Sequence, residues 1–143
     1  MRTHLYFAYG SNLDVDQMRV RCPSARALER AHLTHHRLDF SYYSSRWKGG
    51  AADVIPHSDG IVWGVLYAMD DAALTALDGY EAGYTRVLLE VRDAEHRPRT
   101  AVSYTVDQKR SFRPSAVYLD KMLRWGGHWS LPEDYLRGLE SWR

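Results

Sequence analysis

The chain has 143 residues, which is the size of a single domain and is long enough to bury a core without disulfides. Its formal net charge is +1, so the composition gives no basis for binding nucleic acid or a membrane surface. Cys22 is the only cysteine, which excludes an intramolecular disulfide and fits a reducing compartment. No stretch has the pattern of a signal peptide or a membrane span. We therefore expect one cytoplasmic domain over residues 1–143.

The hydrophobic pattern of the first half predicts a strand, a helix and then four more strands, at about 4–9, 14–21, 26–33, 37–43, 51–55 and 61–68. Pro23 is expected to end the helix, and 44–50 is rich in loop-forming residues. Pro56, Asp59 and Gly60 predict a turn between the last two strands. The final strand is almost continuously apolar, as expected for a strand buried on both faces.

The second half predicts a helix, a hairpin and two closing helices, at about 72–77, 84–92 with 99–106, 115–125 and 132–141. Asp70 or Asp71 can cap the first of these helices. Prolines at first-turn positions and glycines at helix stops mark the other ends, at Pro114, Pro132, Gly79 and Gly126-Gly127. In the hairpin, Val87, Leu89 and Val91 recur with period two and form one apolar face. Many strands with few helices predict a mixed domain, a curled sheet or small barrel with helices outside.

The most informative segment is 6–13, with the sequence YFAYGSNL. An apolar strand ends there in a polar turn that leads directly into a helix. Gly10 permits a sharp turn and the close approach of a ligand, and Ser11 and Asn12 favour a turn with outward N–H groups. Asp14 can cap the following helix, so the loop suits a carboxylate or another anion. An ordinary strand-to-helix turn is the alternative.

The octapeptide resembles the signature of the γ-glutamylcyclotransferase family, whose members carry a Tyr-Gly-Ser-Asn loop after the first strand. Three later segments are similar to the family in the same order, at 49–52, 62–67 and 77–81. The resemblance runs from about residue 5 to about residue 140 and loosens after Tyr84. It implies a compact α+β fold, a mixed sheet or barrel with flanking helices, and a pocket at one mouth of the barrel.

Glu81 lies in a segment rich in glycine and tyrosine, which can place a carboxylate in a partly apolar cavity and so raise its pKa. A solvated loop glutamate is the alternative. The resemblance implies that Glu81 is catalytic, first as general base and then as general acid. In the implied reaction the α-amine of a γ-glutamyl group attacks its own γ-carbonyl. The products are 5-oxoproline and a free amino acid or amine, and neither a cofactor nor a metal is required.

The resemblance also implies that the loop backbone holds the glutamyl carboxylate or the developing oxyanion. The substrate-binding residues expected on this basis are Tyr9, Gly10, Ser11, Asn12, Leu13, Tyr84 and Tyr118. Tyr84 could hydrogen-bond the substrate or orient Glu81, whereas a core position is an equal alternative for Tyr84 and the favoured one for Tyr118. Asp78 could share a proton with Glu81, but an aspartate beside glycine is expected instead to bond local N–H groups and fix the loop.

Other groups of residues give weaker indications of a functional site. His32, His35 and His36 form a cluster, but a structural zinc would need further ligands that the lone Cys22 is not placed to supply, so no metal site is expected. Cys22 precedes a proline at a helix end, away from the positive N-terminus that would activate a thiol. A hydrolase nucleophile elbow has the pattern Gly-x-Ser-x-Gly, whereas Tyr9 and Leu13 stand at the glycine positions around Ser11.

Four arginines make the N-terminal third mildly basic, and we expect them to lie on a solvated face: Arg19, Arg21, Arg26 and Arg30. Three tryptophans near the C-terminus could mark an interface, but core packing is the favoured explanation: Trp125, Trp129 and Trp142. The expected partner is a small γ-glutamyl substrate, with no nucleic acid and no membrane. The oligomeric state stays open, a homodimer included.

The loop is more similar to the branch that acts on γ-glutamyl amino acids or amines than to the glutathione-specific branch. Three alternatives remain at this stage. One is a non-catalytic domain on the same fold that binds a small molecule. Another is removal of a γ-glutamyl protecting group from a larger metabolite. The third is a hydrolase that releases glutamate.

Overall fold

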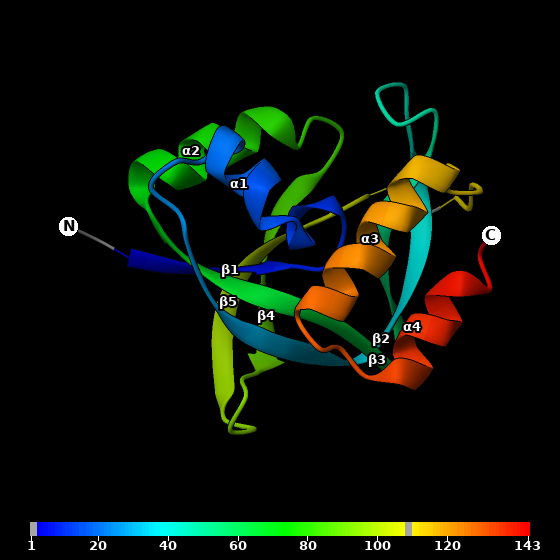
Figure 1. Ribbon diagram of the computed structural model, residues 1–143. Coiled ribbons are helices and arrows are strands. Elements are labelled where there is room, and N and C mark those ends of the chain that lie inside the picture. Colours follow the sequence, from blue (N-terminus) through cyan, green and yellow to red (C-terminus); the bar gives the residue numbers. More distant parts are fainter. Residues whose placement is uncertain (1–2, 108–109) are drawn as a thin grey trace.

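The computed structural model describes residues 3–107 and 110–143. In these residues five strands close into a barrel in the order β1-β3-β2-β4-β5, with helices packed around it (Figure 1). The elements are β1 (Thr3–Ala8), a 3₁₀ turn η1 (Ser11–Leu13), α1 (Val15–Arg21), β2 (Arg26–Ser44), β3 (Gly49–Asp70), α2 (Asp71–Tyr80), β4 (Thr85–Arg92), β5 (Pro98–Thr105), α3 (Ala116–His128) and α4 (Glu133–Glu140). The predicted α+β barrel with flanking helices is confirmed.

The strands β2 and β3 are long and bent, and they pair antiparallel along most of their length. The prediction of two shorter strands in each was wrong. In β2 the expected break is a bulge between Thr34 and His36, where His35 adopts a φ of 59°. The turn expected in β3 is absent, because the chain continues there as one strand. Gly60 lies at this point, and a Cβ on it would be 2.1 Å from the carbonyl oxygen of His36. Polar and glycine residues therefore mark irregularities of pairing here and not chain reversals.

The strand β1 lies between β3 and β5, antiparallel to the first and parallel to the second, with Tyr6 opposite Val102. Its C-terminal end therefore points to the mouth of the barrel, where the loop at 9–12 begins. The predicted hairpin is confirmed as β4 and β5, paired in register from Thr85 with Thr105 to Arg92 with Pro98. Val91 is buried, whereas Leu88 on the opposite face is exposed.

The N-terminal caps of α1 and α2 are aspartates, as predicted. Asp14 Oδ1 accepts a hydrogen bond from the Gln17 amide at 3.0 Å, and Asp70 Oδ1 accepts one from the Ala73 amide at 2.8 Å. The stop predicted at Gly79 was wrong, because α2 continues to Tyr80. The chain turns instead at Gly83, whose φ of +89° suits glycine and whose Cβ position would clash with the Tyr42 ring.

The stop predicted at Gly126-Gly127 was also wrong, because α3 continues to His128. A Cβ on Gly126 would lie 2.6 Å from Leu136 Cδ2, so this glycine lets α3 and α4 pack closely. Pro132 is the N-cap of α4, and Pro114 lies before the N-cap of α3 at Ser115, so neither occupies the expected first turn.

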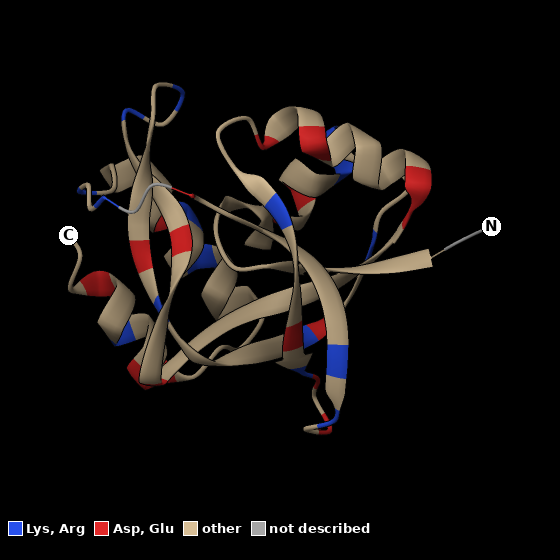
Figure 2. Cartoon of the chain, turned by 180° about the vertical axis from the view of Figure 1, so that it is seen from behind, with Lys and Arg blue, Asp and Glu red and all other residues tan. Residues whose placement is uncertain are grey.

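The C-terminal tryptophans are partly buried and pack against the hydrophobic core: Trp125, Trp129 and Trp142. The Trp142 ring meets Phe40 edge-on at a centroid distance of 4.9 Å, and Trp129 Nε1 donates to the Leu13 carbonyl at 3.1 Å. Figure 2 shows basic and acidic residues interspersed over the described chain. None of the described helices is long and apolar enough to cross a membrane.

Candidate active site

A cavity opens at the barrel mouth where the loop after β1 meets the segment after α2. The cavity and its opening to solvent together contain about 320 Å³ of empty space. Strand β3 contributes Ala52, strand β5 contributes Tyr104, and helix α3 contributes Tyr118. The lining residues are Tyr6, Tyr9, Gly10, Ser11, Asn12, Ala52, Glu81, Tyr84, Ser103, Tyr104 and Tyr118. Residues distant in sequence are thus brought together around one acidic side chain.

That side chain is Glu81, the C-cap of α2, which lies at the edge of the cavity. Its Oε1 accepts a hydrogen bond from Asn12 Nδ2 at 3.2 Å. Burial raises the pKa of Glu81 to about 7, the charge of Arg21 opposes that rise, and the charge of Asp78 adds to it. A carboxyl group with this pKa exchanges protons readily at neutral pH.

The amide of Asn12 is held in one orientation. Its Oδ1 accepts hydrogen bonds from Gln17 Nε2 at 2.9 Å and from Arg21 Nη1 at 3.1 Å. Its Nδ2 therefore faces the other way and donates to the Tyr6 hydroxyl at 3.0 Å as well as to Glu81. The side chain of Asn12 fixes the carboxylate, which the sequence analysis did not foresee, since it assigned a role chiefly to the loop backbone.

The loop approaches the cavity wall so closely that no side chain fits at Gly10. A Cβ there would lie 2.7 Å from the Tyr118 hydroxyl and 3.1 Å from Ala52 Cβ. The Tyr118 hydroxyl is in turn placed by a hydrogen bond that it accepts from the Ala52 amide at 3.0 Å. Glycine at this position therefore lets the loop pack directly against Tyr118 and Ala52 at the cavity.

Tyrosine hydroxyls surround the carboxylate and are tied to the framework. Tyr9 donates to the Tyr104 carbonyl and Tyr84 donates to the Ala52 carbonyl, each at 2.6 Å. Burial raises the pKa of Tyr118 to about 12 and lifts the pKa values of Tyr9 and Tyr84 well above 10. All of these hydroxyls keep their protons at neutral pH. Tyr9 and Tyr84 donate theirs to backbone carbonyls, whereas Tyr118 accepts from Ala52 and can donate its own proton into the cavity.

Asp78 does not bond the local N–H groups that the sequence analysis expected. Both of its carboxylate oxygens accept from Arg86, and one also accepts from the Tyr104 hydroxyl. Burial works against ionisation of Asp78, but the hydrogen bonds from Arg86 and Tyr104 outweigh it and lower its pKa. The ionised Asp78 anchors the end of α2 to β4 and β5, and its charge acts on Glu81 from a distance.

The structure places all but one of the predicted site residues at the cavity. Leu13 is the exception, because it is 1% exposed, belongs to the core and does not line the cavity. Tyr6 and Tyr104 were missed, although they lie on the neighbouring strands β1 and β5 and form an edge-to-face ring pair. Arg21 is 7% exposed, so the expectation that it lies on a solvated face was wrong.

The histidines do not form the cluster that their spacing suggests. His35 donates to the Ser58 carbonyl, His36 donates to the Thr34 carbonyl, and His32 packs on the Trp63 ring. Cys22 is buried and donates to the Ala73 carbonyl, and burial raises the pKa of its thiol to about 11, which fits the expectation that it is no nucleophile.

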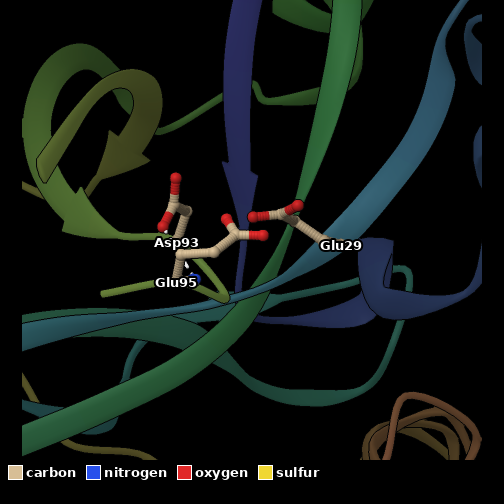
Figure 3. A group of neighbouring side chains, drawn as sticks. All are labelled: Glu29, Asp93 and Glu95. Atoms are coloured by element: carbon tan, nitrogen blue, oxygen red, sulfur yellow. Dashed lines mark hydrogen bonds between the residues drawn. The ribbon is translucent and has the colours of Figure 1, made fainter. Parts of the chain in front are cut away.

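Among the described residues, the group whose ligand atoms lie close enough to hold a metal ion is Glu29, Asp93 and Glu95 (Figure 3). Asp93 accepts from the Glu95 and Arg97 amides, and Glu29 accepts from the Ala94 amide. These carboxylates hold the β4–β5 turn, which accounts for their proximity without an ion.

The chain is similar to known proteins in both sequence and structure. A model of the AIG2-like family matches residues 61–139. The chain is 33% identical to γ-glutamylcyclotransferase of Mus musculus, over 97% of the chain and 78% of that protein. It is 32% identical to γ-glutamylcyclotransferase of Homo sapiens, over 96% of the chain and 77% of that protein. The chain belongs to the γ-glutamylcyclotransferase family.

A solved structure described as a γ-glutamyl cyclotransferase superposes on 97% of the chain with a TM-score of 0.92 and 31% identity, and the match covers 87% of that structure. The γ-glutamylcyclotransferase-like fold, predicted from the resemblance at 6–13 and at three later segments, is therefore confirmed. As a member of the γ-glutamylcyclotransferase family, the chain is an enzyme of cyclotransferase type.

Proposed function

We propose that the enzyme cleaves γ-glutamyl amides, with Glu81 as its general base and general acid. The α-amine of the γ-glutamyl group attacks its own γ-carbonyl carbon, a five-membered lactam closes, and the amide bond to the leaving amino acid or amine breaks. The observation that carries this proposal is the Glu81 carboxyl group, which has a pKa of about 7 and is held at the cavity by Asn12.

Protons must move from the attacking nitrogen to the nitrogen of the leaving group, and one carboxyl group can serve both the removal and the delivery. A free α-amine is mostly protonated at neutral pH, so the ionised Glu81 must first remove a proton to create the nucleophile. After the amine has attacked, the protonated Glu81 delivers that proton to the nitrogen of the leaving group, and the bond from the carbonyl carbon to this nitrogen breaks. Glu81, ionised again, takes the second proton from the attacking nitrogen, which keeps one as the lactam N–H, and passes it to the released amine, which leaves as its ammonium form. A pKa near 7 suits both steps, because neither form of the carboxyl group is strongly disfavoured.

The intermediate carries a negative oxygen that needs hydrogen-bond donors. The backbone N–H groups of the loop at 10–12 are proposed to supply them, because these residues line the cavity. The hydroxyls of Tyr84 and Tyr118 line the same space and would hold the extended substrate in a folded, reactive conformation, Tyr118 as a donor and Tyr84 as an acceptor because its proton is donated to the Ala52 carbonyl. Such positioning can contribute several kcal/mol to an intramolecular reaction.

Product analysis tests the proposed reaction directly. Wild-type enzyme incubated with γ-glutamyl-L-alanine in ¹⁸O-enriched water should release 5-oxoproline and alanine in equal amounts, with no ¹⁸O in the 5-oxoproline. Glutamate that carries ¹⁸O would instead identify a hydrolase and contradict the proposal. A panel that adds γ-glutamyl amines, glutathione and bulkier γ-glutamyl amides would define the leaving group.

A further inference from the structure

Arg21, the last residue of α1, is a buried cation beside the candidate active site. It is 7% exposed and lines a second pocket that Glu81 also lines. Its guanidinium lies over the ring of Tyr80, 5.0 Å from the ring centroid. Because Tyr80 directly precedes Glu81 in the chain, this contact places a positive charge next to the segment that carries the carboxylate.

The charge of Arg21 is not neutralised by a neighbouring acid. Within residues 3–107 and 110–143, Arg21 forms no ion pair with a carboxylate. Burial lowers the pKa of Arg21, but a guanidinium keeps its charge at neutral pH. Its electrostatic field therefore acts on Glu81, where it opposes the effect of burial on the carboxyl group.

A chain of hydrogen bonds connects Arg21 to Glu81 through one amide. Arg21 Nη1 donates to Asn12 Oδ1 at 3.1 Å, and Asn12 Nδ2 donates to Glu81 Oε1 at 3.2 Å. A cation at the oxygen of an amide polarises it and makes its N–H groups stronger donors. Gln17 donates to the same oxygen at 2.9 Å but carries no charge. Arg21 thus adds charge to an orientation of Asn12 that Gln17 also supports.

This indirect arrangement suits a carboxyl group that must both take and give a proton. A guanidinium in direct contact lowers the pKa of a carboxyl group by about 1 to 3, which would leave Glu81 a weaker base. Without a cation nearby, burial would raise the pKa of Glu81 beyond its value of about 7. The Asn12 amide lies between the two charges, so Arg21 opposes the effect of burial without cancelling it.

The other groups around Glu81 do not supply a comparable charge. Asp78 on α2 is ionised and raises the pKa of Glu81, and Arg46 on the β2–β3 turn lines the second pocket but is exposed to screening by water. Strand β3 contributes alanines to both pockets, and β2 contributes Tyr42 to the second. Burial raises the pKa values of the cavity tyrosines and of the Cys22 thiol, so they are uncharged at neutral pH: Tyr6, Tyr9, Tyr84, Tyr104 and Tyr118.

Resting on the proposed function, we propose that Arg21 is a positioning residue of this enzyme, which holds the Asn12 amide toward Glu81 and keeps the carboxylate available as a base near neutral pH. It acts through Asn12 and through its charge. Its place in the last turn of α1 favours a cation, because the C-terminal end of a helix is the negative end of its dipole.

The pH profile of kcat/KM for 5-oxoproline release from γ-glutamyl-L-alanine tests this role, because a purely structural defect lowers the rate by one factor at every pH. Arg21→Gln removes the charge and keeps a polar side chain. Its kcat/KM relative to wild type should be about tenfold lower at pH 6 than at pH 9, because the acidic limb moves to higher pH. Arg21→Lys restores a charge, so any loss should be the same at both pH values.

Two control variants separate charge from packing. Gln17→Met removes the neutral hydrogen bond to Asn12 Oδ1 while Arg21 still holds the amide, so any loss should be the same at every pH. Arg19→Gln removes a charge from an exposed position on the same helix, and its profile should match that of wild type. Thermal unfolding shows which variants are folded, and Arg21→Met is the second charge-free variant if Arg21→Gln does not fold.

An equal loss at pH 6 and pH 9 in Arg21→Gln would overturn the inference, because Arg21 would then only support the structure of the site. Unchanged activity would overturn it too. So would a pH-dependent loss that Arg21→Lys, Gln17→Met or Arg19→Gln shares, since the charge at residue 21 would not be its cause. The proposed function stands in all of these cases. Absence of 5-oxoproline from wild type would instead refute the proposed function, and the inference with it.

Discussion

Replacing Glu81 by glutamine should make the fold more stable at alkaline pH, although it removes the proposed catalytic group. The reason is the raised pKa of this carboxyl group, about 7 in the folded protein against 4.5 for an ordinary glutamate. Between these two values the folded protein retains a proton that the unfolded chain has lost. Stability from this group is therefore fully present below about pH 4.5 and is lost as the pH rises through 7.

The size of the effect follows from the two pKa values. A difference of one pKa unit corresponds to about 1.4 kcal/mol, so the full penalty of ionising Glu81 in the folded state is about 3 kcal/mol. Roughly 2 to 3 kcal/mol of it develops between pH 5 and pH 8. Glutamine has nearly the same shape and can still accept the hydrogen bond from Asn12, but it carries no charge. The free energy of unfolding of Glu81→Gln should thus exceed that of wild type increasingly over this interval.

Urea unfolding at pH 5, 6, 7 and 8 measures this difference, because comparing the two proteins at each pH cancels the other titrating groups. Glu90→Gln is the matched control, since this exposed side chain on β4 lies in water and its replacement should give a small difference that does not change with pH. A difference between wild type and Glu81→Gln that stays constant from pH 5 to pH 8 would refute the reasoning, because it would mean that the carboxylate is not desolvated.

Three further substitutions probe the surroundings of Glu81 through activity. Asn12→Ala removes the hydrogen bond to the Glu81 carboxylate, so kcat/KM should fall about 10- to 100-fold and the acidic limb of its pH profile should move above 7. Asp78→Asn removes a negative charge that raises the pKa of Glu81, so the same limb should move to lower pH; movement to higher pH would exclude this electrostatic role. Gly10→Ala places a Cβ 2.7 Å from the Tyr118 hydroxyl, so kcat/KM should fall at least tenfold and the temperature of thermal unfolding should also fall; wild-type activity would show that the close approach of the loop to Tyr118 is not needed for the reaction.

The sequence predicted those parts of the fold that depend on interactions between residues close in the chain. The caps at Asp14 and Asp70 and the alternation in the β4–β5 hairpin were all visible in a single chain. The errors concern residues whose roles are set by distant partners. Gly60 and Gly126 were predicted to end a strand and a helix. Instead, Gly60 lets the backbone of β3 lie close to the His36 carbonyl, and Gly126 lets α3 lie close to Leu136.

In the candidate site, too, the sequence predicted which segments take part but not the contacts that they make with distant residues. The loop at 9–12 and Glu81 were named from sequence, and the structure brings them to one cavity. The partners of Asp78 were not foreseen, because its charge is engaged by Arg86 and Tyr104 from β4 and β5. The burial of Arg21 was missed for a related reason. Its position on α1 places it under the ring of Tyr80, at the end of α2.

The rate of 5-oxoproline formation in Glu81→Gln, compared with wild type on γ-glutamyl-L-alanine near pH 7.5, tests the central claim most directly. General acid–base groups typically contribute about 10²- to 10⁴-fold, and Glu81 is proposed to act in both transfers, so kcat should fall by about 10³-fold or more. The variant must retain its fold, which its unfolding curve establishes. A folded Glu81→Gln enzyme that keeps kcat within tenfold of wild type would contradict the account, because the proton would then be transferred by another group.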